Sequence, residues 1–596
     1  MSTIGNDRPI LIYDGHCAFC RIWLDYWRQI TGDRIEYLAS QDIGDRFPQI
    51  PREAYAKSVQ LVRPDGSVAS GARAVFETLR KERLYPWVAG PSELAYRIIA
   101  PHRNFFYQLT RFTFGTRIEP TRFAATQWLF LRALALIYAI AFGSLALQVG
   151  GLLGARGVVP VVPFLTSVER TGSALRFLAV PSLFWFAADD TTLVGLCFAG
   201  MVFSAMLFLT GFARGKFERL IPLLLFILYL SYASVGQEFL SFQWDSLLLE
   251  TGFLAIFLGR NRIVPWLFRW LVFRLYFLSG AVKLLSGDPT WRNLSAVGFH
   301  WHTQPLPTVI AWYADKLPAG FQHFATAATL GIEVGMPLLI FFPRRLRMFG
   351  AWWLIGLQVL IMATGNYTFF NLLTLALTLF LFDDQALCRF VPVLHRDRLA
   401  ERAEDRSLVP AIAAAIIVMV LSLSHLVETF NGRLPAVLNA PLRYAAPLQI
   451  VNTYGLFAVM TTERIEIVLE GSADGQTWLP YEFKYKPGDL SRAPAWVAPH
   501  QPRLDWQMWF AALSNYQTNP WFISLTLRLL EGSPDVQALL GSNPFPNQPP
   551  RYIRAMAYEY TFTDNQTHRR TGAWWKREAR GLYLPAVGLR SAGSPQ

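Results

Sequence analysis

The chain has 596 residues, of which 53% are hydrophobic and only 16% are charged. This composition excludes a purely soluble protein and predicts a polytopic membrane protein. The net charge of +13 comes from Lys and Arg residues concentrated in short loops between apolar runs. It therefore indicates membrane topology, and we expect no nucleic-acid partner.

Residues 1–110 predict a small α/β domain. Residues 9–15 are typical of a buried strand ending in a turn, and an amphipathic helix follows a Cys-x-x-Cys pair. A second strand at 35–38 and a hairpin across 58–68 complete the unit. The polar start, Met1-Ser-Thr-Ile, carries no signal-peptide pattern, so we expect this domain to stay in the cytosol.

The pair Cys17 and Cys20 predicts redox chemistry. A helix N-terminus stabilises a thiolate, so it lowers the pKa of the first cysteine and prepares it to attack a disulfide. A zinc site or two ordinary buried cysteines are the alternatives. No second Cys/His pair lies nearby to complete a tetrahedral site, and we expect no metal.

The residues around this pair carry a family resemblance, in the run Tyr13, Asp14, Gly15, His16, Cys17, Cys20. The run resembles the DCC family of thiol-disulfide oxidoreductases, a thioredoxin-like group. The resemblance implies that Cys17 attacks a disulfide, that Cys20 resolves the mixed disulfide, and that the partner is another thioredoxin-like protein. His16 stands where many members have an acidic residue.

Residues 111–126 are basic and aromatic, which suits a linker on an anionic cytoplasmic membrane face. Within residues 127–429, apolar runs predict about nine membrane helices, at 127–149, 190–211, 217–236, 239–259, 263–285, 321–342, 348–364, 366–382 and 408–426. The basic loops then fall inside, and the loop after Lys283 and the C-terminal region fall outside.

Five of the charged residues within these apolar runs invite pairing with one another. Counted at about 1.5 Å per residue from the outer helix ends, Glu250, Arg274 and Glu333 lie roughly 18 Å deep, whereas Asp245 and Lys283 lie nearer the outer mouth. Because an unpaired charge costs about 2.5–3.5 kcal/mol at mid-bilayer, equal depths predict pairing. We expect Arg274 to meet Glu250 and Glu333, and Lys283 to face Asp245. These pairs either hold helices together or line a ligand cavity.

The loop beyond Lys283 is rich in aromatic and polar residues, among them Trp291, Arg292, His300, His302 and Gln304. Two histidines without an evident third ligand are weak evidence for a metal, and solvated or hydrogen-bonded histidines are the simpler interpretation.

Residues 430–596 predict a soluble, β-rich α+β domain outside the membrane. Alternation at 464–470 and 481–486 around an Asp-Gly turn predicts an antiparallel sheet, a helix follows from Arg503, and 558–562 predicts another strand. Nucleophile elbows, phosphate loops and paired carboxylates are missing from this sequence, which favours a binding or chaperone surface over an active site.

Collinear motifs across about 120–590 carry a second resemblance: Trp291-Arg292-Asn293, His300-Trp-His302-Thr-Gln304-Pro, Thr364-Gly-Asn366-Tyr, Ile450-Val-Asn452-Thr-Tyr454 and Arg503-Leu-Asp505-Trp506. They resemble the lipase maturation factors. The resemblance implies a multi-pass membrane protein that helps an exported, lipase-like client to fold, in a bacterial inner membrane or, for a eukaryotic chain, the endoplasmic reticulum.

A fainter likeness concerns the run from Tyr276 through Lys283 to Trp291, which is similar to vitamin K-dependent gamma-carboxylases. There the lysine is the catalytic base. The alternative function is therefore a quinone-dependent carboxylase-like or oxidoreductase enzyme with Lys283 as base. A quinone held beside Lys283 or Arg274 could also carry electrons from the dithiol across the membrane.

Overall fold

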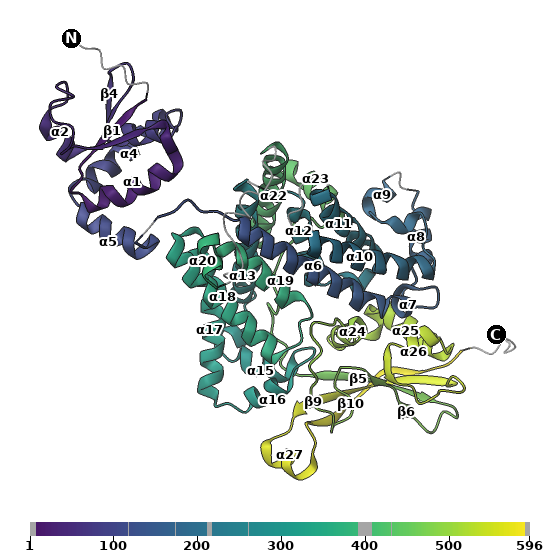
Figure 1. Cartoon of the computed structure of the whole chain (residues 1–596). Helices are drawn as coiled ribbons and strands as arrows, with labels where there is room; N and C mark the ends of the chain where they lie inside the picture. Colours follow the sequence, from purple (N-terminus) through teal and green to yellow (C-terminus); the bar gives the residue numbers. More distant parts are fainter. Residues whose placement is uncertain are drawn as a thin grey trace. The chain divides into compact units, whose positions relative to one another are not determined.

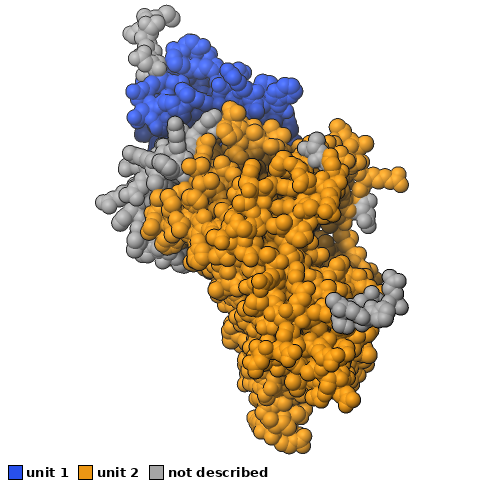
Figure 2. Space-filling view, turned by 90° about the vertical axis from the view of Figure 1, so that its right-hand side faces the viewer, with its two compact units in different colours: residues 1–122, 341–349 blue, residues 123–340, 350–596 orange. Residues whose placement is uncertain are grey.

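The computed structural model describes residues 8–116, 118–172, 175–210, 217–259, 261–390, 408–430 and 432–589. The chain divides into two compact units, one of residues 1–122 with 341–349 and one of residues 123–340 with 350–596 (Figure 2). Each unit is described by itself below, with the element labels of Figure 1.

The first unit is built on a four-stranded mixed sheet of order β2-β1-β3-β4. Its strands are β1 (Ile10–Tyr13), β2 (Glu36–Ala39), β3 (Gln60–Val62) and β4 (Val68–Ser70). β1 is parallel to β2 and antiparallel to β3, and β3 is antiparallel to β4. Helices α1 (Ala18–Thr31), α2 (Arg52–Lys57) and α3 (Gly71–Thr78) follow β1, β2 and β4. The expected strands and hairpin are all present.

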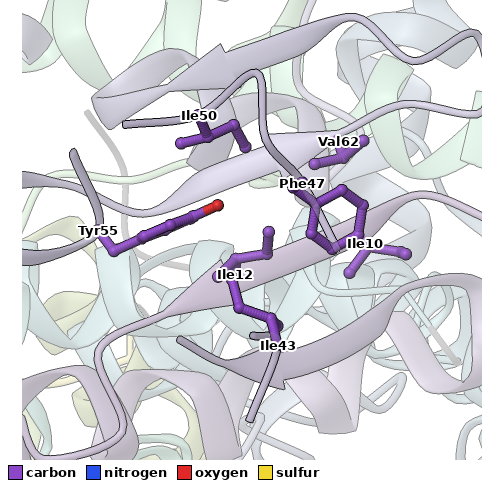
Figure 3. Packing of buried hydrophobic residues seen from close by; sticks show 7 residues of the cluster. All are labelled: Ile10, Ile12, Ile43, Phe47, Ile50, Tyr55 and Val62. Carbon is purple, nitrogen blue, oxygen red and sulfur yellow. The ribbon is translucent and has the colours of Figure 1, made fainter. Parts of the chain in front are cut away.

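Both faces of this sheet are covered. Figure 3 shows one apolar cluster, made of Ile10, Ile12, Ile43, Phe47, Ile50, Tyr55 and Val62. The other face packs Leu11, Leu24, Val59, Leu61, Ala69 and Ala74. Successive residues of a strand point to opposite faces, so the run Ile10-Leu11-Ile12 is apolar throughout because neither face is wet.

Two further helices complete the unit, α4 (Tyr85–Ile99) and α5 (Arg103–Phe114). The ring of Phe114 lies 5.9 Å from that of Trp23 on α1, edge to face. The start of the expected linker at 111–126 is therefore the end of a helix that packs on α1.

In the second unit, six helices among the described residues are long and apolar enough to cross a membrane. They are α6 (Ala124–Ala146), α10 (Asp190–Thr210), α13 (Ile263–Leu285), α17 with the turn after it (Ala319–Phe341), α18 (Arg344–Thr364) and α22 (Leu408–Thr429). Shorter helices are α7 (Val149–Leu153), α8 (Val161–Arg170), α9 (Arg176–Ala179) and α20 (Asp384–Phe390).

The expected count of nine crossing helices is not confirmed. The other three apolar runs contain α11 (Phe217–Val235), α12 (Gln243–Ala255) and α19 (Phe370–Thr378). At 1.5 Å per residue, the 13 residues of α12 span about 20 Å, short of a hydrocarbon core of about 30 Å. The apolar runs are longer than α12 and α19 because they also include residues of the neighbouring 3₁₀ turns, Gln237–Leu240 and Leu379–Leu381.

The loop after Lys283 folds into three short helices, α14 (Pro289–Arg292), α15 (Ala296–Thr303) and α16 (Val309–Asp315). The first turns of α17 lie beside α15, where the Val297 amide donates to Thr326 Oγ1 at 3.1 Å. α17 therefore begins well beyond the end of α13.

The C-terminal part contains α23 (Ala436–Ala445) and a sheet of order β10-β9-β5-β6. Its strands are β5 (Ile465–Ser472), β6 (Leu479–Pro480), β9 (Tyr552–Phe562) and β10 (Trp575–Val587). Strands β7 (Glu482–Phe483) and β8 (Leu540–Ser542) pair separately. Helices α24 (Arg503–Ala511), α25 (Pro520–Leu530), α26 (Pro534–Gln537) and α27 (Asn565–Thr571) complete it.

The strand expected at 481–486 is shorter, because β7 covers only Glu482–Phe483 and lies outside the main sheet. The amides of Tyr485 and Lys486 both donate to Asp505 Oδ1, at 2.8 Å each, instead of to a neighbouring strand. The Asp505 carboxylate thus ends the strand early.

Candidate functional sites

The dithiol lies at the N-terminus of α1. Cys17 is the N-cap, and its Sγ accepts from the Cys20 amide at 3.2 Å and from the Cys20 thiol at 2.6 Å. The Cys20 thiol bond, despite the opposing effect of burial, lowers the pKa of Cys17 to about 6, while the same bond and burial raise the pKa of Cys20. The Cys17 thiol therefore loses its proton more readily than the Cys20 thiol.

Two nearby charges, those of Arg103 and Asp14, affect the pKa of Cys17. Arg103, on α5, lies 3.6 Å from the Asp14 carboxylate, and its charge lowers the Cys17 pKa whereas that of Asp14 raises it. The His16 side chain is exposed, and its backbone amide donates to Asp14 Oδ1 at 3.0 Å. Arg103 comes from another helix, so no local pattern could have indicated it.

Tyr13 and Gly15 shape the turn before the cysteines. The Gly15 amide donates to Gln41 Oε1 at 2.9 Å, and a Cβ at Gly15 would lie 2.8 Å from that oxygen. The Tyr13 hydroxyl accepts from Arg28 at 3.5 Å. A glycine is therefore needed at position 15 for the close approach to Gln41.

Arg274 meets Glu250 in a fully buried ion pair, as expected. The pair is completed by an unexpected segment: Glu250 Oε2 accepts from the Asn452 amide at 2.9 Å and from the Tyr454 hydroxyl at 2.7 Å. Arg274 Nη1 donates to the Asn452 carbonyl at 3.0 Å. The 450–455 motif thus reaches into the helix bundle and supplies further hydrogen bonds to this ion pair.

Glu333 pairs with Lys283, and not with Arg274. Lys283 Nζ donates to both carboxylate oxygens, at 2.7 and 2.6 Å, and lies 5.2 Å from the centre of the Trp291 ring. The depth estimate failed because α17 begins beyond the end of α13, which brings Glu333 level with Gly280. A Cβ at Gly280 would lie 3.0 Å from Glu333 Cβ, so the helices touch there.

Asp245 faces Arg503 of the C-terminal domain, so its expected pairing with Lys283 is also wrong. The guanidinium donates to both carboxylate oxygens, at 2.8 and 3.0 Å, and Tyr229 donates to Oδ1 at 2.5 Å. Arg503 is 1% and Asp245 0% exposed. Sequence depth could not find a partner that lies in a different domain.

These pairs resemble structural connections more than a reactive site. Breaking a buried pair leaves an uncompensated charge, so each holds its elements together. Lys283 Nζ directs its hydrogen bonds to both carboxylate oxygens of Glu333. Lys283 Nζ donates to Glu333, and the two Nη atoms of Arg274 contact Glu250 and the Asn452 carbonyl, so these atoms contact the protein and do not face a quinone.

The loop after Lys283, here called the outer loop, is held by hydrogen bonds on two sides. His300 Nε2 and Gln304 Oε1 contact the Tyr367 hydroxyl at 2.9 and 3.3 Å, and the Trp291 indole donates to the Phe457 carbonyl at 3.0 Å. Burial lowers the pKa of His300 to about 3, so its imidazole is neutral. His300 Nδ1 has no hydrogen-bond partner within the described part of the chain.

His302 serves a different contact from His300, because its Nδ1 lies 3.1 Å from Asp315. Arg292 is exposed to solvent. Across the described ranges, no group of three or more His, Cys, Asp or Glu residues could hold a metal ion.

The C-terminal domain donates hydrogen bonds to the backbone carbonyls of this loop. Arg464 donates to the carbonyls of His302, Gln304 and Pro305, and its other side pairs with Glu466 at 2.7 Å. Trp509 adds an indole bond to the Thr303 carbonyl at 2.8 Å.

Asn366, just after α18, makes four bonds that join the loop to this domain. Its amide nitrogen donates to the Leu306 and Ala495 carbonyls at 3.0 and 2.8 Å, and its oxygen accepts from the Val497 and Ala498 amides at 2.7 and 3.0 Å.

Trp506 makes aromatic contacts where the C-terminal domain packs on the helix bundle. Its ring lies 4.7 Å from that of Trp244 and 5.7 Å from that of Tyr367. The three motif residues Arg503, Asp505 and Trp506 therefore make three separate contacts: an ion pair, hydrogen bonds at a strand end and a ring contact.

Comparison with known proteins decides the family. The model of the lipase maturation factor transmembrane domain matches residues 125–389, and that of the lipase maturation factor C-terminal domain matches residues 450–585. Lipase maturation factor 2 of Xenopus laevis is 35% identical over 77% of this chain and 82% of its own. The chain belongs to the lipase maturation factor family.

Other family members are equally similar. Lipase maturation factor 2 of Homo sapiens is 35% identical over 77% of this chain and 82% of its own, and lipase maturation factor 1 of Mus musculus is 35% identical over 79% and 89%. No solved structure is significantly similar to the chain. A multi-pass membrane protein is supported, but these vertebrate relatives do not support the expected bacterial inner membrane.

The ion pairs and loop contacts above lie in the two matched regions, so they belong to the lipase maturation factor part. The dithiol precedes both regions, and the oxidoreductase and carboxylase resemblances remain predictions. Sequence reasoning also missed Arg464, Tyr367 and Asn366. The Asn366 and Tyr367 signal was present in the Thr364-Gly-Asn-Tyr motif.

Proposed function

We propose that this protein assists the maturation of an exported, lipase-like client. The proposal rests on the 35% identity with lipase maturation factors across both family domains. The client-binding part would be the C-terminal domain together with the outer loop. Hydrogen bonds of Arg464, Asn366 and Trp509 join these two segments.

The proposal requires that the C-terminal domain lies on the side of the membrane to which the client is exported, whichever membrane that is. We propose that the basic start of α18, at Arg344 and Arg345, faces the cytosol, as the positive-inside rule favours. Asn366, beyond the other end of α18, bonds the C-terminal domain, which supports a non-cytosolic place for that domain.

The first unit is proposed to be a thioredoxin-like thiol-disulfide oxidoreductase. Its support is the mixed β2-β1-β3-β4 sheet and the placement of Cys17 at the N-terminus of α1, with a lowered pKa. The Cys17 thiolate attacks a protein disulfide and displaces one thiolate. Cys20 then loses its proton, attacks the Cys17 sulfur and releases the second thiolate, so two electrons pass to the substrate and a Cys17–Cys20 disulfide forms. A thioredoxin-like dithiol would reduce it again.

A lipase secretion assay tests the maturation proposal. Cells without an endogenous lipase maturation factor, given a lipase reporter, should export active lipase only when the full chain is expressed. The readout is lipase activity per unit of lipase protein. Unchanged specific activity, with the chain present in the membrane, would reject the proposal.

A trapping experiment tests the dithiol proposal separately. Cys20→Ser should accumulate mixed disulfides on non-reducing gels, whereas Cys17→Ser should trap none. Equal behaviour of the two variants contradicts a redox pair. If Cys17→Ser also keeps full lipase maturation, the two parts of the chain work independently.

A further inference from the structure

Two successive helices of the first unit expose apolar stripes to solvent. On α4 the stripe is Trp87, Leu94 and Ile98, which are 87%, 61% and 50% exposed, and on α5 it is Phe105, Leu109 and Phe112, which are 64%, 42% and 65% exposed. At about 100° per residue, each set falls within a sector about 60° wide. Large exposed apolar groups that line up in this way mark an interaction site.

The surface of α5 is divided into three sectors. Thr110 and Thr113 are buried, on the side that packs on α1. Asn104, Gln108 and Arg111 form an exposed polar sector, and the apolar stripe lies between the two. A helix with separate exposed polar and apolar sectors is typical of helices that lie in the membrane interface.

The charge of this segment suits an anionic surface. Residues 80–116 contain six Arg and Lys residues and only two Glu residues, Glu82 and Glu93. The Glu93 carboxylate accepts from the Tyr85 hydroxyl at 2.9 Å, so part of the small negative charge is already occupied within the unit. Basic residues near a bilayer are attracted to anionic headgroups.

The chain also keeps α5 near a bilayer. α5 ends at Phe114, and the first candidate span begins at Ala124. An extended chain covers at most about 3.5 Å per residue, so the tether between them reaches no more than about 35 Å.

We propose that the stripes of α4 and α5 dock the dithiol unit on an anionic bilayer surface. Phe105, Leu109 and Phe112 enter the headgroup region, and the basic residues contact lipid phosphates. Arg103 lies about 160° around α5 from Phe105. The docked helix therefore turns its Arg103–Asp14 contact, and Cys17 beside it, away from the lipid and toward soluble partners.

Hydrogen exchange of the full chain in lipid nanodiscs tests this docking. We compare nanodiscs of phosphatidylcholine alone with nanodiscs of equal phosphatidylcholine and phosphatidylglycerol. Deuterium uptake over residues 84–114 should be at least about fivefold slower in the anionic discs, because docking stabilises both helices against local opening. High salt should reduce the difference.

Two matched variants separate lipid contact from other causes. Phe105→Ser with Leu109→Ser and Phe112→Ser should remove the slowing, whereas Asn104→Ser with Gln108→Ser, on the adjacent polar sector, should keep it. Unchanged exchange over residues 10–39 shows that the unit is folded; if the triple variant fails there, Arg97→Gln with Arg111→Gln should still reduce the difference between the two discs.

Three results would overturn the proposal. The first is equal uptake in the two kinds of disc, and the second is slowing that survives in the triple serine variant. The third is slowing that also occurs in detergent without lipid or that grows with protein concentration, which would assign the stripes to a second copy of the chain.

Discussion

The dithiol turn and the seam between the helix bundle and the C-terminal domain handle charge in opposite ways. Cys17 is only partly buried, and its lowered pKa leaves a thiolate beside one cation that is shared with Asp14. In the seam, Asp245 is completely buried and receives two bonds from Arg503 and a third from Tyr229. A partly satisfied charge is available for reaction, whereas a fully satisfied one is available only for holding elements together.

The largest effect should come from breaking the seam. Arg503→Ala leaves Asp245 buried without its guanidinium and should lower the free energy of unfolding by about 3–5 kcal/mol, measured by urea titration of the solubilised full chain. Arg52→Ala is the matched control, because Arg52 lies at the same 2.8 Å from Asp45 but both side chains are exposed. A similar small change in both variants would refute the contrast between the two regions.

Asn366→Ala should have the next largest effect. The substitution removes the partner of the Val497 and Ala498 amides and of the Ala495 carbonyl, at a cost of about 2–3 kcal/mol, while the Leu306 carbonyl keeps the bond from the backbone amide of residue 366. The same urea titration measures it. Asn293→Ala removes an exposed asparagine that bonds only Ser295 and should leave the curve unchanged; equal losses would mean that Asn366 does not join the two parts.

Local patterns in the sequence predicted much of this molecule. A short apolar run indicated β1, a turn signal indicated the β3–β4 hairpin, alternation indicated β5, and hydropathy indicated the six long helices. The charged residues of the bundle were also recognised correctly as a group that must pair. The pairing was predicted wrongly, because it depends on where each helix begins relative to its neighbours. Since α17 begins beside α15, Glu333 lies level with Gly280 and not with Arg274.

Contacts between distant segments were the other gap. Arg503 and Asn452 reach the bundle from the C-terminal part, and Arg103 reaches Asp14 from α5. No periodicity encodes such contacts, since each depends on the tertiary packing of elements that look independent in sequence. The motif residues Asn452 and Tyr454 were visible as a motif, but their carboxylate partner, Glu250, was not.

Lys283 allows a test of whether a buried charge holds helices together or acts as a catalytic base. Lys283→Met leaves the Glu333 carboxylate unpaired and should cost about 2 kcal/mol, less than Arg503→Ala because both groups are slightly exposed. Adding Glu333→Met should restore most of that stability, since the pair is then replaced by apolar side chains. If the double variant is stable and matures lipase normally, Lys283 only holds helices; stability with complete loss of maturation would favour the base hypothesis instead.

The smallest effect is expected at the dithiol, where the structure predicts a titration instead of a loss of stability. In the reduced full chain, the thiolate absorbance of Cys17 should appear with a midpoint of about pH 6 and be absent in Cys17→Ser. Because the folded pKa lies below that of an ordinary thiol, the thiolate contributes stability above the ordinary value, and this contribution is lost as the pH falls through about 6.

Arg103→Ala identifies the source of that low midpoint. Removing a cation that lowers the pKa of Cys17 should move the midpoint upward, but Cys20→Ala should move it further, since the Cys20 thiol bond is the largest cause and the charge of Arg103 a lesser one. Arg46→Ala, an exposed arginine of the same unit that contacts Phe47, serves as the charge control and should leave the midpoint in place. A larger shift in Arg103→Ala than in Cys20→Ala would mean that the site is tuned by charge, and the dithiol would then resemble the seam in depending on a distant arginine.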